Sequence, residues 1–236
     1  MNLPVNKVIY DGNTLIDLSG DTVSPDKLME GVTAHDKTGA QIVGTATGGG
    51  GATEPYVEET YDSYGNLTGA VLHGHTKVRN TAFSYCSKLA LIFLPDGITT
   101  IGYSAFEQCP NLALSALPDG ITSVENSAFS GCSKLTLTAL PAEITSIGAY
   151  AFSDCSKLTL TALPAEITSI GAYAFKGCTG LTAITFKGTP TTIGMNAFQG
   201  CTNLTTINVP WAEGAVANAP WGATNATINY NYTEGA

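Results

Sequence analysis

A spacing of 23 residues governs a little over half of this chain. The dipeptide Ala-Phe recurs six times at this spacing, and a cysteine follows each alanine by four residues. A fixed period of about 20 to 50 residues is typical of solenoids, in which each repeat stacks on its neighbours. The alanines are Ala82, Ala105, Ala128, Ala151, Ala174 and Ala197, and the cysteines are Cys86, Cys109, Cys132, Cys155, Cys178 and Cys201.

Within each repeat the apolar residues fall into columns. The unit reads A-F-x-x-C-x-x-L, continues as a run of apolar and threonine residues that ends in proline, and closes with I-T-[ST]-I-G. One coil cannot bury its apolar face alone, so these columns are predicted to point inward between stacked coils. The phenylalanine column comprises Phe83, Phe106, Phe129, Phe152, Phe175 and Phe198, and the leucine column comprises Leu89, Leu112, Leu135, Leu158, Leu181 and Leu204.

The alternation of leucine and threonine in residues 158–161, and in the equivalent segments, predicts a strand with leucine in the core and threonine in solvent. Stacked coils would then build one parallel β-sheet. Proline suits the end of this strand, and the glycine after I-T-[ST]-I suits a tight turn before the Ala-Phe segment. That segment is predicted to form one short helical turn on the opposite side. The expected fold class is an α/β repeat solenoid of leucine-rich-repeat type.

Two repeats depart from the pattern. Glu125 replaces the glycine in the second repeat, whereas Lys187 and Pro190 replace the proline and the isoleucine in the fifth. Residues 128–152 and 151–175 have nearly the same sequence and differ only in Gly131 against Asp154, which indicates a recent duplication.

The A-F-x-x-C-x-x-L and I-x-x-I-G elements closely resemble the BspA-like leucine-rich repeat, and the match covers a little over half of the chain. The resemblance implies a curved, right-handed solenoid used for adhesion or ligand binding, usually on bacterial surfaces or in host attachment. It implies no catalysis.

The rest of the chain divides around these repeats. Residues 1–47 are expected to form a small, mostly-β attachment module, with a hairpin over residues 8–18, a short helix from Ser24 and Pro25 to Gly31, and a strand over residues 41–43. The expected order is then a glycine-rich linker (48–55), a cap hairpin (56–77) around residues 64–66, the six repeats (78–210) and an aromatic C-terminal cap (211–236).

The first module has a resemblance of its own. The segments Asp-Thr-Val-Ser-Pro-Asp-Lys-Leu (21–28), Gly-Val-Thr-Ala-His-Asp-Lys-Thr-Gly (31–39) and Ile-Val-Gly-Thr (42–45) are similar to the N-terminal module of tail or head-fibre proteins in phages of Gram-positive bacteria. This resemblance implies a virion anchor that binds other virion proteins and displays the solenoid outward.

Composition excludes some partners. The formal net charge is -9, and a nucleic-acid partner would require a basic stripe that the sequence lacks. The longest apolar run, residues 89–94, is too short for a membrane span, so we expect no membrane insertion. No signal-peptide pattern follows Met1, which predicts synthesis in the cytoplasm.

The six cysteines invite a disulfide or metal interpretation. Stacked coils would bring them about 5 Å apart, yet parallel, in-register side chains have poor geometry for a disulfide. The sequence contains no C-x-x-C pair of the kind that binds zinc. We therefore predict a structural ladder of buried thiols.

Two histidines are candidate metal ligands. His73 and His75 lie two residues apart on a predicted strand and would face the same way, but a metal site needs at least a third ligand. A trimer with this strand on its axis could supply it. Neither carboxylate pairs such as Glu58 and Glu59 nor catalytic motifs such as G-x-S-x-G satisfy the requirements of an active site, so we predict no enzyme activity and no cofactor.

Ligand-binding candidates lie on the predicted outer face and in the C-terminal cap. Rows of threonine could hydrogen-bond a repetitive glycan, although threonine also suits any solvated strand face. Trp211 and Trp221 could stack on sugar rings if exposed, or be half-buried in the cap. The threonines are Thr136, Thr138, Thr159, Thr161, Thr182 and Thr205.

These observations predict a non-enzymatic, virion-associated fibre protein that uses its solenoid for host-surface attachment or particle decoration. One alternative is a BspA-like adhesin of the bacterial cell surface, and another is a passive decoration protein without a receptor. A host glycan or protein is the expected ligand, and a homotrimer is an open alternative.

Overall fold

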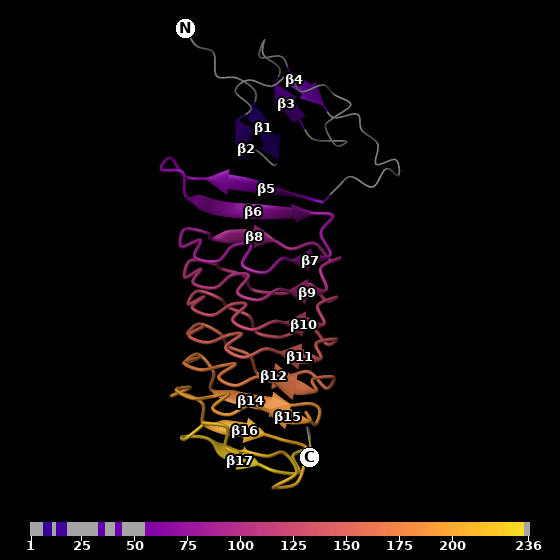
Figure 1. Cartoon of the computed structure of the whole chain (residues 1–236), viewed down its shortest axis with the longest axis vertical. Coiled ribbons are helices and arrows are strands. Elements are labelled where there is room, and N and C mark those ends of the chain that lie inside the picture. Colours follow the sequence, from indigo (N-terminus) through magenta and orange to yellow (C-terminus); the bar gives the residue numbers. More distant parts are fainter. Residues whose placement is uncertain (1–6, 11–12, 18–32, 36–40, 44–54, 234–236) are drawn as a thin grey trace. The chain divides into compact units, whose positions relative to one another are not determined.

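Figure 1 shows a computed structural model of the chain, which describes residues 7–10, 13–17, 33–35, 41–43 and 55–233. The contacts divide the chain into two units, residues 1–54 and 55–236. Each unit has its own sheets and is described separately.

The first unit contains one antiparallel sheet. Its strands are β1 (Lys7–Tyr10), β2 (Asn13–Asp17), β3 (Thr33–His35) and β4 (Gln41–Val43), in the order β2-β1-β3-β4. The β1–β2 hairpin and the strand at 41–43 confirm two elements predicted from the sequence. The helix predicted from Ser24 to Gly31 lies outside the described residues.

The second unit begins with a hairpin of β5 (Tyr56–Tyr61) and β6 (Leu67–His73). Its turn is the predicted one: Gly65 has a φ of 79°, and the Asp62 carboxylate accepts the backbone N–H groups of Tyr64 and Asn66, each at 2.9 Å. β6 pairs in parallel with β8 (Leu91–Phe93) and buries Ala70 and Leu72. The hairpin thus covers the apolar end of the first coil.

The I-T-[ST]-I segments form a six-stranded parallel sheet, the most regular part of the solenoid. Neighbouring strands are one repeat apart in register, so that Ser123 pairs with Ser146 and Val124 with Ile147. The sheet has the order β15-β13-β11-β10-β9-β7. Its strands are β7 (Lys77–Val78), β9 (Thr100–Ile101), β10 (Ser123–Val124), β11 (Ser146–Ile147), β13 (Ser169–Ile170) and β15 (Thr192–Ile193).

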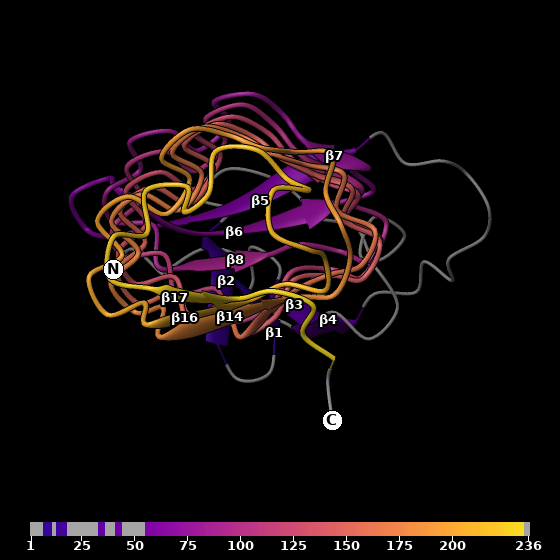
Figure 2. The same ribbon diagram turned by 90° about the horizontal axis from the view of Figure 1, so that it is seen from below.

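A second parallel sheet follows the leucine–threonine run on another side of the coils (Figure 2). The prediction of one sheet is therefore wrong. This sheet contains β12 (Ala162–Leu163), β14 (Ala183–Phe186), β16 (Thr206–Asn208) and β17 (Thr227–Asn229).

The strand predicted at residues 158–161 is also misplaced, because the leucine–threonine run of the fourth repeat forms a strand only at residues 162–163. Leu158 and Leu160 are buried as predicted, and Thr159 and Thr161 are exposed. In this repeat the buried residues are spaced by two and then by three, which a regular strand cannot maintain. In the fifth repeat the buried residues Ile184 and Phe186 alternate with more exposed neighbours, as a strand requires. β14 is therefore longer, with four residues.

The Ala-Phe segments do not form the predicted helical turns, and the described part of the chain contains no helix. In each repeat the residue before the alanine and the residue three after it have positive φ, as in Tyr150 (57°) and Asp154 (59°). Left-handed residues interrupt a right-handed helix. The backbone N–H groups of Tyr150, Phe152 and Asp154 instead donate to carbonyls of the next coil at 3.0, 2.8 and 2.6 Å.

Stacked phenylalanines fill the centre of the solenoid. Consecutive members of the column have ring centroids 5.2 to 5.5 Å apart and nearly parallel planes. All six rings are buried. Because the ring spacing follows the stacking distance of the coils, each of the four inner phenylalanines stacks between the equivalent rings of the two neighbouring coils.

The cysteine column connects the coils by hydrogen bonds. The thiols of Cys109, Cys132, Cys155, Cys178 and Cys201 each donate to the phenylalanine carbonyl of the preceding coil, at 3.0 to 3.1 Å. The same carbonyls accept the cysteine N–H of their own coil, as in Cys155 to Phe152 at 3.2 Å. The thiol therefore serves as a donor and not only as a small apolar group.

The C-terminal segment continues as a degenerate seventh coil. Trp221 lies 23 residues after Phe198 and accepts its backbone N–H at 2.9 Å, and β17 pairs in parallel with β16. Phe186 packs against Trp211 and Trp221 with ring centroids 5.2 and 6.2 Å away. These rings close the apolar end of the solenoid.

Glycine follows the I-T-[ST]-I strands because the coils approach closely there. A Cβ atom at Gly148, Gly171 or Gly194 would lie 2.3 to 2.4 Å from a backbone nitrogen of the preceding coil. At these three positions an added side chain would overlap the preceding coil unless the local backbone shifts.

We expect Gly171→Ala to lower the free energy of unfolding by about 1–3 kcal/mol, because the new methyl group overlaps the backbone of Ala149. Gly97→Ala is the matched control, since its Cβ would meet only the carbonyl oxygen of His75 at 3.9 Å. The control should change stability by no more than about 0.5 kcal/mol. Urea unfolding of both variants measures the difference, and equal stabilities would contradict the close approach.

Candidate binding surface

The threonine rows predicted to bind a ligand are on the surface. Thr136, Thr138, Thr159, Thr161, Thr182 and Thr205 are all exposed. The Thr205 hydroxyl also connects two coils, because Oγ1 donates to the carbonyl of Thr182 at 3.2 Å. The rows form a polar wall, and the cavity found in the solenoid lies on a different part of the coil.

The two tryptophans are not available for stacking on sugars. Trp211 is 6% exposed and Trp221 is 1% exposed, so both belong to the core of the C-terminal closure. The indole of Trp221 donates to the carbonyl of Ala217 at 2.7 Å. Both side chains are therefore more deeply buried than the half-buried position expected for a cap. Neither is a candidate for ligand binding.

The two histidines do not share a strand. His73 ends β6, stacks on Tyr56 at 4.4 Å between ring centroids, and places Nε2 3.1 Å from the Glu58 carboxylate. Gly74, with a φ of 67°, separates it from His75 beyond the strand end. Among the residues that the structure describes, no three histidine, cysteine or acidic side chains are grouped to hold a metal ion.

The cysteines are free thiols, and five of the six are buried. Burial is the main cause that raises the pKa of each thiol, to about 12 for Cys109 and Cys201 and further for the central members. At neutral pH they therefore stay protonated, as their hydrogen bonds to phenylalanine carbonyls require. A protonated, buried thiol is neither a nucleophile nor a metal ligand.

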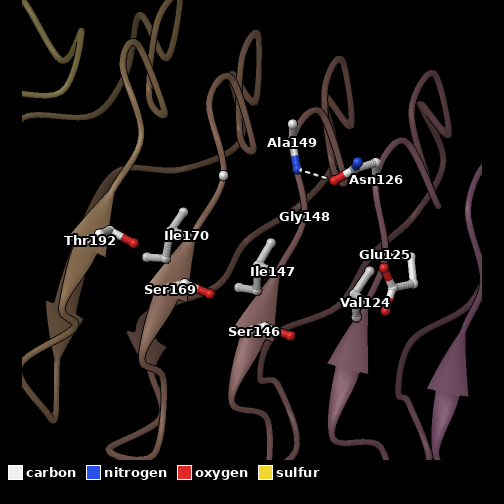
Figure 3. A pocket seen from close by; sticks show the side chains of 11 residues that line it. Val124, Glu125, Asn126, Ser146, Ile147, Gly148, Ala149, Ser169, Ile170 and Thr192 are labelled. Atoms are coloured by element: carbon white, nitrogen blue, oxygen red, sulfur yellow. Dashed lines mark hydrogen bonds between the residues drawn. The ribbon is translucent and has the colours of Figure 1, made fainter.

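A shallow cavity of about 330 Å³ lies at the carboxyl ends of β10, β11, β13 and β15 (Figure 3). We call it the glycine-column groove, because Gly148 and Gly171 lie among its lining residues. The hydroxyls of Ser146, Ser169 and Thr192 lie along the strands that approach it.

Glu125 and Asn126 form one end of this groove. Asn126 Oδ1 accepts the backbone N–H of Ala149 at 2.8 Å, which fixes the amide across the coil boundary (Figure 3). Glu125 is exposed and accepts the Ser123 hydroxyl at 3.3 Å. The groove therefore combines a carboxylate, an amide and several hydroxyls in one concave surface.

Sequence reasoning did not place any ligand in this groove. From the sequence, Glu125 was recognised only as a departure from the glycine that follows the I-T-[ST]-I segment. That departure was the available signal, because a position that breaks the repeat rule without a packing reason is a candidate functional residue. After β9, β11, β13 and β15 the same position holds Gly102, Gly148, Gly171 and Gly194.

We expect the buried thiols to make the fold sensitive to alkali. The Cys109 thiol has a pKa of about 12 in the folded chain against an ordinary value of 9.0. Above pH 9.0 the unfolded chain releases the proton while the folded chain keeps it, so stability falls by about 1.4 kcal/mol for one pH unit.

Cys109→Ser keeps a hydroxyl donor that does not ionise in this range. Urea unfolding at pH 7 and pH 10 should show that the wild-type chain loses about 1.4 kcal/mol more than the variant between the two conditions. The same pH dependence in both proteins would exclude the raised thiol pKa as its cause.

The comparisons with known proteins agree with this architecture. The model of the "BspA type Leucine rich repeat region" matches six copies over residues 58–161 and 145–214. No curated protein gives a significant match. Within the described residues, no helix is long and apolar enough to cross a membrane.

Solved structures with the same fold include a leucine-rich repeat protein from Bacteroides ovatus, with 22% identity and a TM-score of 0.57 over 70% of this chain and 43% of that one. The pneumococcal vaccine antigen PcpA is also similar, with 19% identity and a TM-score of 0.53 over 73% and 44%. The chain spans less than half the length of either, and at this identity the likeness concerns the fold alone. The family model covers more than half of the chain, which therefore belongs to the BspA type leucine-rich repeat family.

Proposed function

We propose that this chain is a non-enzymatic adhesion protein of the bacterial cell surface, which binds its ligand through the outer surface of the solenoid. The observation that carries the proposal is the combination of a fully packed core with an exposed, repetitive polar wall and one polar groove. Membership of a family whose repeats typically serve binding or adhesion supports the same function.

The chemistry of the groove favours binding over catalysis. Its lining includes a single carboxylate, Glu125, and neither histidine nor cysteine. Acid–base catalysis would require a second group of suitable pKa within hydrogen-bond reach of the substrate. His73 is engaged by Glu58 and Tyr56 at the hairpin end of the solenoid, where it packs on a strand.

The resemblance of residues 1–47 to phage fibre modules stays a prediction. The family match begins at residue 58, so its support extends to the solenoid and not to that module. A cell-surface adhesin accounts for the family match directly, whereas the virion location, the virion partners and the trimer all depend on the N-terminal resemblance.

A binding assay tests the proposed function. Full-length chain, fluorescently labelled, should bind fixed epithelial cells or immobilised mucin in a saturable manner, and unlabelled chain should compete. Flow cytometry measures the cell-bound fraction against labelled albumin as a control. Binding no stronger than that of albumin to every surface would refute adhesion.

A further inference from the structure

The glycine-column groove contains one residue that the stacking of the coils does not explain. Four of the other strands of this sheet are followed by glycine (Gly102, Gly148, Gly171 and Gly194), whereas Arg79 follows β7 and Glu125 follows β10. The glycines avoid overlap with the preceding coil. The backbone at Glu125 still follows the repeat, because its N–H donates to the Ile101 carbonyl at 2.9 Å and its carbonyl accepts the Ala128 N–H at 3.2 Å. The carboxylate therefore lies at the surface, while the backbone of Glu125 makes the same hydrogen bonds as the other coils.

The groups beside Glu125 complement each other as donors and acceptors. Asn126 uses Oδ1 to accept the Ala149 N–H, which leaves its Nδ2 group to donate to a ligand. The carboxylate of Glu125 is a strong acceptor. Ser146 and Ser169 are half-buried hydroxyls that both donate and accept.

Two other positions of the column that contains Asn126 hold large, exposed side chains. Tyr103 holds this position in the preceding coil and is 51% exposed, and Met195 holds it two coils beyond Ala149 and is 65% exposed. The column between them contains Ala149 and Ala172, which are small. Tyr103 and Met195 do not line the groove, but the repeat places Tyr103 one coil before Asn126 in the same column.

From this arrangement we infer that the groove binds a short neutral oligosaccharide, an inference that rests on the proposed adhesion function. A pyranose presents several hydroxyls, which suit a carboxylate and an amide, and an apolar face, which suits the ring of Tyr103. A basic peptide would match only Glu125 and would leave the hydroxyls of Ser146, Ser169 and Thr192 without a role.

The length of the groove limits the ligand. It extends from β10 to β15 across β11 and β13, which is three strand spacings or about 14 Å. Affinity should therefore rise with the number of sugar rings only until the oligosaccharide spans these strands.

Two variants of the full-length chain test the site without disturbing the fold. Glu125→Gly introduces the residue that four other coils carry at this position. Ala149→Tyr introduces the residue that the Asn126 column carries at Tyr103. The matched control is Glu166→Gly, which makes the same change of charge and restores the glycine found at Gly97 and Gly120 in the first two repeats. Glu166 is exposed and does not line the groove.

The probe is an array of neutral oligosaccharides that includes cellulose, chitin and mannan fragments and mucin glycans without sialic acid or sulfate, with calorimetric titration of the strongest hit. We expect Glu125→Gly to weaken binding by about ten- to a hundredfold, the effect of losing hydrogen bonds to a charged group. Ala149→Tyr should also weaken binding, because the new ring would fill part of the groove that Ala149 lines. Glu166→Gly should bind like the wild type.

Several outcomes would overturn the inference. Equal affinity of the wild type and Glu125→Gly would place the sugar elsewhere, and binding of an oligolysine peptide but of no glycan would assign the groove to a basic partner. If the chain adheres to cells but retains no neutral glycan, the groove inference fails while the proposed function stands. If it neither adheres to cells nor binds glycans, both fail.

Discussion

The stacking of one coil on the next is the interaction on which the whole solenoid depends. A single coil of 23 residues has too little interior to bury its apolar side chains, and only repetition supplies the missing surface. The phenylalanine rings stack at 5.2 to 5.5 Å, and the cysteine thiols donate to carbonyls of the coil before. Backbone hydrogen bonds connect the coils in both sheets and in the turns between them.

The same stacking restricts what the surface can carry. Where coils approach closely the repeat requires glycine, and where side chains point outward it permits almost any small polar residue. A ligand site must therefore be built from positions that vary without loss of packing, or from a residue that departs from the repeat. Glu125 is of the second kind, and the groove beside it combines such a departure with the ordinary serines and threonines of the sheet.

The sequence predicted some features of the solenoid and missed others. The sequence predicted the inward columns because Phe152, Cys155 and Leu158 recur at one spacing, and the core contains all their equivalents except Cys86, which is partly buried. The predicted helical turn was wrong, because Tyr150 and Asp154 adopt left-handed backbone conformations that their residue types do not indicate. Of the candidate site, the sequence revealed the anomaly at Glu125 but not the serines and glycines that lie beside it.

The sequence by itself determined the repeat length, the inward columns and the family, because these depend on spacing along one chain. Only the tertiary structure decided that the coils form two sheets instead of one, that Trp211 and Trp221 are buried, and that a groove forms beside Glu125. The physical reason is that backbone donors in the turns pair with the following coil, and that a concave surface depends on the relative heights of side chains in neighbouring coils. Those relations exist only between coils, once they are stacked.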